Sequence, residues 1–313
     1  MKTKKTSRGE DMKVFVDGSA GTTGLEIVNR LKERRDLTLV TLAEEQRKDP
    51  IRRKEAMLSA DLAVLCLPDD AAMEAVSFAE GSKVKIIDAS TAHRVSPDFV
   101  YGLPELPGRR EEIRSATRVA NPGCHASGFI ALVAPLVLAG VLSKDAPISA
   151  FSLTGYTGGG KKMIREYEEG DAECAAPRQY ALGQSHKHLP EMQRQTGLTR
   201  APIFLPVVAA FPRGMQVSVP LSPDYLTCGA EGIKEVYRDL YRGGVIRYEE
   251  VEGTTLPADL MAGKDGMIVS LVGNGDRLVA IASFDNLGKG ASGAAIQNLN
   301  LMLGAEETTG LNL

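Results

Sequence analysis

Cys124 is the residue whose neighbours most favour nucleophilic chemistry. It ends the segment Asn121–Cys124, which reads Asn-Pro-Gly-Cys, and begins an apolar run that reaches about Leu138. Asn is a favoured helix N-cap and Pro favours the first helical position, so the segment predicts a helix with the thiol in its first turn. Free N–H groups and the helix dipole lower the pKa of a thiol placed there. We therefore predict a thiolate suited to acyl transfer, with a buried structural cysteine as the alternative.

Two histidines, His186 and His188, could move the protons that such a thiol needs. They stand one residue apart before a predicted helix, so in an extended segment their side chains face the same way. An imidazole titrates near neutral pH and can serve as acid or base; an ordinary surface pair is the alternative. No third ligand accompanies them, so we predict no metal site. His125 follows the thiol directly and is expected to point away from it, so it is not predicted to be its base.

Several polar residues could bind an anion. Ser90 and Arg94 follow a predicted strand that ends at Asp88, at the sheet edge where ligands bind. The planar guanidinium of Arg94 could clamp a phosphate, with a surface salt bridge as the alternative. The glycine loop at 155–162, which contains Lys161, predicts a cradle for a phosphate or carboxylate. Its spacing is not that of a P-loop, so no NTPase is predicted.

A glycine loop at 18–24 predicts a dinucleotide site. It reads Gly-Ser-Ala-Gly-Thr-Thr-Gly and lies between a predicted strand and a predicted helix. Its candidate cofactor-binding residues are Gly18, Ser19, Gly21, Thr22, Thr23 and Gly24. Glycines let backbone approach a pyrophosphate, and the helix N-terminus supplies N–H groups; a tight turn without a ligand is the alternative. After the second strand, an acid at 44–45 would favour NAD, whereas Arg47 or Lys48 would favour the 2′-phosphate of NADP, which we prefer.

These residues need a scaffold, and the first third of the chain predicts a doubly wound parallel sheet. Predicted strands at 14–16, 37–42, 61–67 and 84–87 alternate with helices at 24–34 and 69–79. The continuous apolar run at 61–67 is typical of a strand buried on both faces, and Cys66 is expected to pack within it. In the first helix, Leu25, Val28 and Leu31 are expected to share the buried face.

The middle of the chain predicts an α+β region with a mostly antiparallel sheet. Its predicted strands lie at 148–153, 203–209, 215–221, 245–251, 267–272 and 277–284, with helices at 187–195 and 230–241. A final apolar helix is predicted at 288–304.

Length and composition limit the possible classes of protein. A chain of 313 residues suggests two domains. The chain has no Trp, 5% aromatic residues and a net charge of −3, so we do not expect it to bind nucleic acid. It has no long apolar run, so we do not expect a membrane span. Four cysteines without a CxxC pair fit a reducing cytoplasm. The basic start at 1–11 has no apolar stretch behind it, so we predict a disordered tail rather than a secretory signal.

Five motifs in order carry a family resemblance. The chain resembles the shorter type of N-acetyl-γ-glutamyl-phosphate reductase, a family related to aspartate-semialdehyde dehydrogenase, over nearly its whole length. The motifs are Gly-Ser-Ala-Gly-Thr-Thr-Gly (18–24), Asn-Pro-Gly-Cys (121–124), His-Lys-His (186–188), Phe-Pro-Arg-Gly-Met (211–215) and Asp-Asn-Leu-Gly-Lys-Gly-Ala (285–291). His125 is one departure, because many members are expected to have Tyr there.

The resemblance implies a Rossmann-type domain of residues 1–122 plus 287–313, which binds NADP(H), and a second α+β domain of residues 123–286 for catalysis and oligomerisation. It implies Asn286 near the nicotinamide, Cys124 as the acyl carrier, and His188, with His186 as second choice, as the acid/base. Ser90, Arg94, Asn121, Lys161 and Arg213 are the expected substrate-binding residues.

The implied reaction converts N-acetyl-L-glutamyl 5-phosphate to the 5-semialdehyde in arginine biosynthesis, in a cytoplasmic homodimer or homotetramer. A covalent thioester on Cys124 divides one hard reduction into two easier steps. Aspartyl phosphate and a longer N-acetylated acyl phosphate are alternative substrates. A dinucleotide-binding sensor without catalysis and a thiol hydrolase are the alternative classes of protein.

Overall fold

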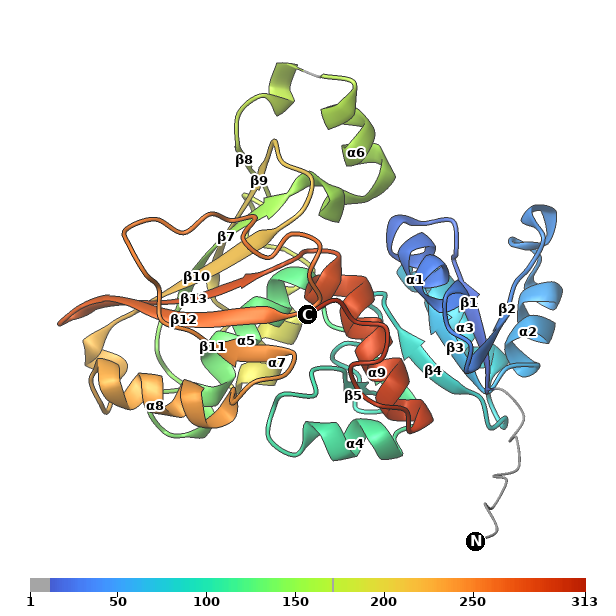
Figure 1. Cartoon of the computed structure of the whole chain (residues 1–313), viewed down its shortest axis with the longest axis horizontal. Coiled ribbons are helices and arrows are strands. Elements are labelled where there is room, and N and C mark those ends of the chain that lie inside the picture. The colour runs from blue at the N-terminus through green and yellow to red at the C-terminus, as the bar shows by residue number, and fades with distance from the viewer. Residues whose placement is uncertain (1–11, 171) are drawn as a thin grey trace, which may run out of the picture.

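The computed structural model describes residues 12–170 and 172–313, so the predicted tail at 1–11 lies outside the described residues. Two sheets lie on either side of the C-terminal helix (Figure 1). The first has six strands, all parallel, in the order β2-β1-β3-β4-β6-β5. This confirms the predicted doubly wound sheet. The strands are β1 (Met12–Asp17), β2 (Leu37–Val40), β3 (Leu62–Leu65), β4 (Lys85–Asp88), β5 (Val100–Tyr101) and β6 (Arg118–Ala120).

Helices cover both faces of this sheet, because its strands are apolar on both sides. Val14 packs with the helices on one face, and its neighbour Phe15 packs with those on the other. All four residues of β3 are buried, as its continuous apolar run predicts. The connecting helices are α1 (Thr22–Lys32), α2 (Pro50–Leu58), α3 (Asp69–Phe78) and α4 (Arg109–Ser115), with a 3₁₀ turn, η1, at Glu44–Gln46.

The second sheet has seven strands in the order β11-β12-β13-β10-β7-β9-β8 and is mostly antiparallel, as predicted. One face packs on α5 (Cys124–Leu138), a helix buried on every side over most of its length. The strands are β7 (Ser149–Gly155), β8 (Arg178–Gln179), β9 (Ile203–Ala209), β10 (Met215–Leu221), β11 (Ile246–Tyr248), β12 (Met267–Asn274) and β13 (Arg277–Phe284). The remaining helical elements are η2 (Tyr156–Gly159), α6 (Gly160–Glu168), η3 (Ala172–Cys174), α7 (Leu189–Thr196), η4 (Pro223–Tyr225) and α8 (Ala230–Leu240).

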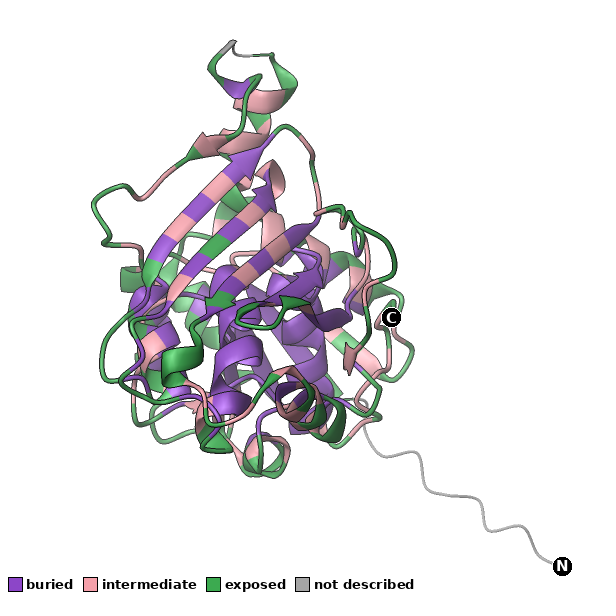
Figure 2. Ribbon diagram, turned by 90° about the vertical axis from the view of Figure 1, so that its left-hand side faces the viewer, coloured by how far each residue is buried: buried purple, intermediate pink, exposed green. Residues whose placement is uncertain are grey.

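The opposite face of the second sheet is open over β7 and β9 and is apolar. We call it the outer sheet face and define it by Phe151, Leu153, Ile203, Leu205 and Val207, which the strand register places on one side. Phe151 is 42% exposed and Ile203 is 59% exposed. In Figure 2 these strands carry half-buried and exposed bands, whereas the helices behind the sheet are buried.

The end of the chain returns to the first sheet. After β13, residues Gly288–Ser292 form a single π-helical turn, η5, and α9 (Gly293–Leu303) follows it. Ile296 and Leu299 pack with β1 and β3 in the core of the first sheet. The predicted helix at 288–304 is therefore correct in extent, but its first turn is wider than an α-helix.

Local expectations fail at several places. Leu25 is 49% exposed, and the buried face of α1 carries Ile27 beside Val28 and Leu31. Cys66 lies just beyond β3 and is partly exposed, so it is not inside the strand. The predicted strand at 245–251 shortens to β11, and α2, α4 and α6 were not predicted. Across the described ranges, no helix is long and apolar enough to cross a membrane.

Candidate active site

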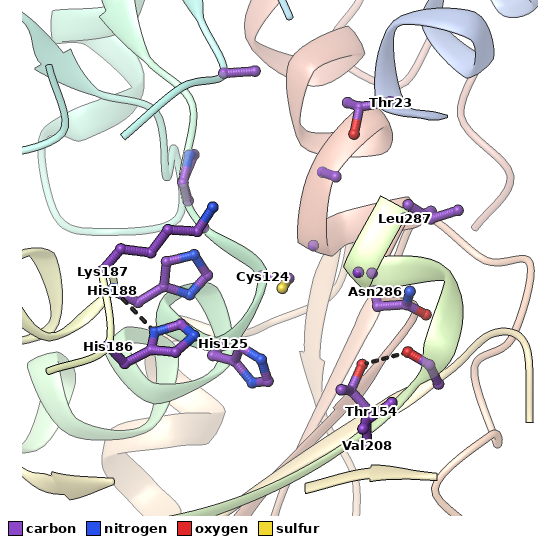
Figure 3. A pocket seen from close by; sticks show the side chains of 18 of the residues that line it. Thr23, Cys124, His125, Thr154, His186, Lys187, His188, Val208, Asn286 and Leu287 are labelled. Carbon is purple, nitrogen blue, oxygen red and sulfur yellow. Dashed lines mark hydrogen bonds between the residues drawn. The ribbon is translucent and has the colours of Figure 1, made fainter. Parts of the chain in front are cut away.

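A cavity of about 350 Å³ surrounds Cys124, between the carboxyl edge of the first sheet and the second sheet (Figure 3). Imidazoles lie together on one side of the sulfur, and Asn286 lies on the other. The structure brings all three predicted catalytic residues and several of the predicted binding residues to this cavity. Those that line it are Thr23, Arg94, Asn121, Cys124, His186, His188 and Asn286.

Cys124 is the first residue of α5, but the helix is capped differently from the prediction. Gly123 is the N-cap, so Asn121 and Pro122 precede the helix. Asn121 instead donates its amide to the carbonyl of Ala291, at 3.0 Å. Burial raises the pKa of the Cys124 thiol, and this effect exceeds the lowering by the N–H of His125 and by nearby cations. The expectation of a lowered thiol pKa is therefore wrong for the resting site, because desolvation outweighs the helix terminus.

The turn before Cys124 is crowded by functional groups. A Cβ atom at Gly123 would lie 2.4 Å from Nε2 of His188 and 2.6 Å from Oε1 of Glu191, so only glycine fits. The buried Glu191 carboxylate accepts bonds from the backbone N–H of Gly123 at 3.2 Å, from Arg94 at 2.8 Å and from the hydroxyl of Tyr101 at 2.6 Å. It thereby fixes the nucleophile's turn. Glu191 was not predicted as a site residue, since an acid three residues after an N-cap position is ordinary in a first helical turn.

His186 and His188 do not lie in an extended segment, because a turn precedes α7 and His188 is its N-cap. Their rings still meet edge to face with centroids 4.6 Å apart. Nδ1 of His186 accepts the backbone N–H of His188 at 3.1 Å, whereas the buried Nδ1 of His188 has no hydrogen-bond partner among the described residues. Burial lowers the pKa of His188 well below its usual value and that of His186 to about 4. Both are therefore neutral at pH 7, as a proton acceptor must be.

His125 is buried beside the other two imidazoles, although we expected it to point away from the thiol. Its Nδ1 lies 2.7 Å from Oγ of Ser152 and its Nε2 lies 2.5 Å from Oη of Tyr180. Burial lowers its pKa to about 3. Both of its ring nitrogens are occupied and it lines the cavity, which supports the expectation that His125 is not the base.

Two cations line the cavity within the described part of the chain, Arg94 and Lys187. Arg94 is held by the carbonyls of Asn121 at 3.0 Å and Ala89 at 3.1 Å, besides Glu191. Lys187 was not predicted as a site residue, because only the two histidines on either side of it were considered as catalytic groups. Ser90 is buried, and its hydroxyl donates to Asp88 at 2.8 Å, so it lies behind the cavity wall and does not line it.

Asn286 is fixed by both of its amide atoms. Its Oδ1 accepts the N–H of Gly214 at 2.9 Å, and its Nδ2 donates to Thr157 at 2.8 Å. The adjacent Arg213 forms two bonds of 2.9 Å to Asp285 and one of 2.7 Å to Glu26 of α1. The structure therefore does not bring Arg213 to the cavity. The Phe-Pro-Arg-Gly-Met motif supports Asn286 from behind.

A second cavity of about 420 Å³ lies over the glycine loop at 18–24 and shares Thr23, Ala89, Gly158 and Leu287 with the first. A Cβ at Gly24 would lie 2.4 Å from the carbonyl oxygen of Gly18, and no side chain caps the N-terminus of α1. The buried hydroxyl of Thr22 has no partner among the described residues. An open helix terminus, a side-chain-free cradle and an unused hydroxyl all fit a dinucleotide pyrophosphate.

Two predicted basic residues lie apart from Cys124. Lys161 lines the second cavity and not the first, so its place favours a cofactor contact over a substrate contact. Arg47 is exposed just after η1 and lines neither cavity. Within residues 12–170 and 172–313, no group of three or more His, Cys, Asp or Glu side chains is placed to hold a metal ion.

Comparison with known proteins identifies relatives of this chain. The family model described as "Semialdehyde dehydrogenase, NAD binding domain" matches residues 13–116, and "Semialdehyde dehydrogenase, dimerisation domain" matches residues 124–286. An N-acetyl-gamma-glutamyl-phosphate reductase of Burkholderia lata is 45% identical over 94% of this chain and 97% of its own length. One of Brucella anthropi is 48% identical over 93% and 98%.

Solved structures share the fold at low identity. Aspartate semialdehyde dehydrogenase II of Vibrio cholerae, complexed with ASA, superimposes with a TM-score of 0.73 at 16% identity, covering 94% of this chain and 99% of its own. Aspartate semialdehyde dehydrogenase of Candida albicans with NADP gives 0.69 at 14% identity, covering 94% and 98%.

Proposed function

This chain belongs to the N-acetyl-γ-glutamyl-phosphate reductases of the semialdehyde dehydrogenase family, and from this premise we propose how its residues act. The reaction is the reductive dephosphorylation of N-acetyl-L-glutamyl 5-phosphate to the 5-semialdehyde and phosphate, in arginine biosynthesis. One observation supports our assignment of residues above the others. Cys124 shares a cavity with a neutral His188 that has a free ring nitrogen, and that cavity adjoins the dinucleotide cavity.

The first half of the reaction is an acyl transfer. The Cys124 thiol gives its proton to the neutral imidazole of His188, and the sulfur attacks the acyl carbon. The bond from this carbon to the phosphate oxygen breaks, phosphate leaves, and a thioester remains on Cys124. Arg94 and Lys187 are the proposed contacts for the anionic groups of the substrate, since both line the cavity. Asn121 also lines the cavity and is proposed as a substrate contact. Ser90 does not line it, and we propose that Ser90 acts indirectly, through its hydrogen bond to Asp88 at the end of β4.

The cofactor supplies a hydride to the thioester carbon when it is bound across the two cavities. The loop Gly18–Gly24, with Ser19, Gly21, Thr22 and Thr23, would hold its pyrophosphate, and Lys161 lies where it can add a positive charge. Asn286 would orient the nicotinamide, and Arg47 is proposed for the 2′-phosphate of NADP. The His188 imidazolium would stabilise the oxyanion on the Cys124 adduct. Collapse then releases the aldehyde, and the proton returns to the thiolate.

The assignment of the nucleophile is tested in reverse, with aldehyde, phosphate and NADP. Cys124→Ser should lose roughly 10³-fold or more in turnover, because a hydroxyl is far less acidic and less nucleophilic than a thiol and would form an ester in place of the thioester. Cys228→Ser, away from both cavities, is the matched control and should retain full turnover. Mass spectrometry with acyl phosphate and no cofactor should show an adduct only when Cys124 is present. Turnover of Cys124→Ser near the control value would reject the assignment.

The same assay separates the other possible substrates and classes of protein. Aspartate semialdehyde and a longer N-acetylated semialdehyde should turn over far more slowly than the N-acetylglutamate compound. A sensor protein would bind NADP without forming the adduct, and a thiol hydrolase would form the adduct but release the free carboxylic acid from it without consuming NADPH. Either pattern would contradict the proposed residue roles.

The matched dimerisation domain indicates an oligomer. We propose a homodimer or homotetramer that buries the outer sheet face, because its apolar side chains are otherwise exposed. We also propose that residues 1–122 and 287–313 form the cofactor domain and residues 123–286 the catalytic one, since α9 packs on the first sheet. The wide spacing of the four cysteines, without a CxxC pair, supports our proposal of a reducing cytoplasm.

A further inference from the structure

Lys289 is a completely buried lysine that the proposed mechanism does not use. Its ammonium lies 2.8 and 2.9 Å from the two carboxylate oxygens of Glu105 and 2.5 Å from Oε1 of Gln297. Removing an ammonium from water is costly even when it is paired, and apolar residues of similar volume often stabilise a fold as well or better. This ion pair therefore needs a reason other than stability.

The position of Lys289 in the chain points to that reason. It lies in η5, the π-helical turn at Gly288–Ser292, and such turns are frequent at functional sites. Its neighbours Asn286, Leu287, Gly290 and Ala291 line the Cys124 cavity, whereas Lys289 does not. The turn thus presents backbone and Asn286 to the cavity and directs one charged side chain away from it.

The turn is packed too tightly to move without consequence. A Cβ at Gly290 would lie 2.9 Å from the Cβ of Cys124, and one at Gly288 would lie 2.0 Å from the carbonyl oxygen of Lys264. A shift of η5 would therefore change the contact between Gly290 and the nucleophile. It would also move Asn286, which stands directly before the turn.

The other end of the ion pair is firmly held. Gln297 of α9 donates to Glu105 at 2.8 Å and to Glu307 at 2.8 Å, and Glu307 in turn pairs with Arg110 at 2.7 Å. Glu105 stands shortly after β5, in the first sheet. The chain of contacts therefore fastens the π-helical turn to the frame of the first sheet.

We propose that Lys289 is a positioning residue, which holds the π-helical turn so that Asn286 and Gly290 keep their places beside Cys124. The proposal rests on the proposed function, because it assigns a part in the same reaction. A displacement of about 1 Å at reacting groups can cost on the order of 100-fold in rate. Lys289 would thus act on turnover without touching substrate or cofactor.

The test is the substitution Lys289→Met, which keeps about the same side-chain length and removes the charge. We expect kcat to fall roughly 10- to 100-fold, with the Kd for NADP changed less than about threefold. In the reverse direction, with aldehyde deuterated at its carbonyl carbon, the primary isotope effect on kcat should rise as hydride transfer becomes limiting. The rate of Cys124 alkylation by iodoacetamide, without substrate or cofactor, should also change at least threefold.

Two variants separate positioning from stability. Lys289→Met leaves Glu105 buried and unpaired, so the double variant with Glu105→Gln should regain thermal stability while kcat stays low. Arg110→Met cuts the exposed end of the same network and should keep kcat within twofold of wild type. If Lys289→Met does not fold, the same measurements are made on the double variant Lys289→Met with Glu105→Gln.

The proposal would be overturned if the double variant recovered kcat together with thermal stability. It would also be overturned if Lys289→Met left kcat, the isotope effect and the alkylation rate unchanged. Its failure is distinct from that of the proposed function. If wild-type protein lacked reductase turnover, the reaction would be wrong, while a changed alkylation rate would still place Lys289 behind Cys124.

Discussion

Single residues decide the chemistry here, and Cys124 shows how position and surroundings can oppose each other. The helix start that the sequence indicates is present, and the N–H of His125 does favour the thiolate. Burial favours the neutral thiol more strongly, so the resting Cys124 is protonated and the proposed reaction needs a base. The local pattern predicted the helix start, but the degree of burial depends on residues more than a hundred positions away.

The first prediction concerns the reactivity of this thiol. In the free enzyme, the rate of Cys124 alkylation should still be rising between pH 8 and 9.5, because its pKa is raised by burial. Stopped assays with iodoacetamide at several pH values would measure it, with Cys124→Ser to subtract the other thiols. A rate that is already constant at pH 7 would contradict the buried, protonated state.

The second prediction distinguishes the two histidines. His188→Asn should lower kcat by roughly 10²–10⁴-fold, the usual cost of losing an acid/base group. His186→Asn should cost less, since Nδ1 of His186 already accepts the N–H of His188. Steady-state kinetics in both directions, with circular dichroism to confirm folding, would compare them. Equal losses would mean that the free nitrogen of His188 does not identify the base.

Among the helices and strands, sequence patterns predicted the elements that bury one face or both faces. Strand β3 lies in a continuous apolar run, which is typical of a strand buried on both faces, so the sequence predicted it. The helix α2 was missed because its residues, Pro-Ile-Arg-Arg-Lys-Glu-Ala-Met-Leu, show little apolar periodicity. Its buried side includes Arg53, which is paired with Asp17 at 3.0 Å, so a tertiary ion pair places this helix.

The third prediction is that the outer sheet face of the second sheet forms the oligomer interface. Phe151→Asp should break the oligomer, because it places a charge within the apolar outer sheet face. Light scattering after gel filtration should give a mass of two or four times 33.5 kDa for wild type, and about one chain or one pair for the variant. Met73→Asp on α3, at an exposed apolar position of the first domain, is the control and should keep the wild-type mass. An unchanged mass for Phe151→Asp would place the interface elsewhere.

For the whole molecule, the active cavity was only partly predictable. The motifs correctly brought Cys124, His188 and Asn286 together, because each carries its own pattern. Glu191 and Lys187 were missed, since their roles arise from the convergence of α7 on the turn at Gly123. Arg213 was expected at the substrate, but Asp285 and Glu26 hold it behind Asn286.

The fourth prediction concerns stability in acid. His125 and His188 are buried and neutral, with folded pKa values of about 3 and well below the usual 6.5, so they take up protons in the unfolded chain first. Their contribution to the free energy of unfolding is present above pH 6.5 and declines as pH falls below it, for His125 down to its folded pKa of about 3. At pH 5 the loss is about 2 kcal/mol for His125, and His188 changes the stability in the same direction. Thermal unfolding from pH 7.5 to 4.5 would show it.

The control for this prediction is His125→Gln, which keeps hydrogen-bonding groups without a titrating ring. Its melting temperature should be lower at pH 7.5 but should fall less steeply with acid than that of wild type. Parallel curves for the two proteins would mean that other groups cause the acid sensitivity.

The return of α9 to the first sheet has a consequence for biosynthesis. Residues from Asn286 to Ala291 contribute to the walls of the cavities, with Leu287 lining both, and α9 completes the core beneath α1 and β3. A nascent chain emerging from the ribosome therefore has its glycine loop and its thiol long before it has the wall between them. Catalysis can begin only once α9 has been made and has folded onto the first sheet, and until then the unfinished sheet exposes the apolar surface that α9 will cover.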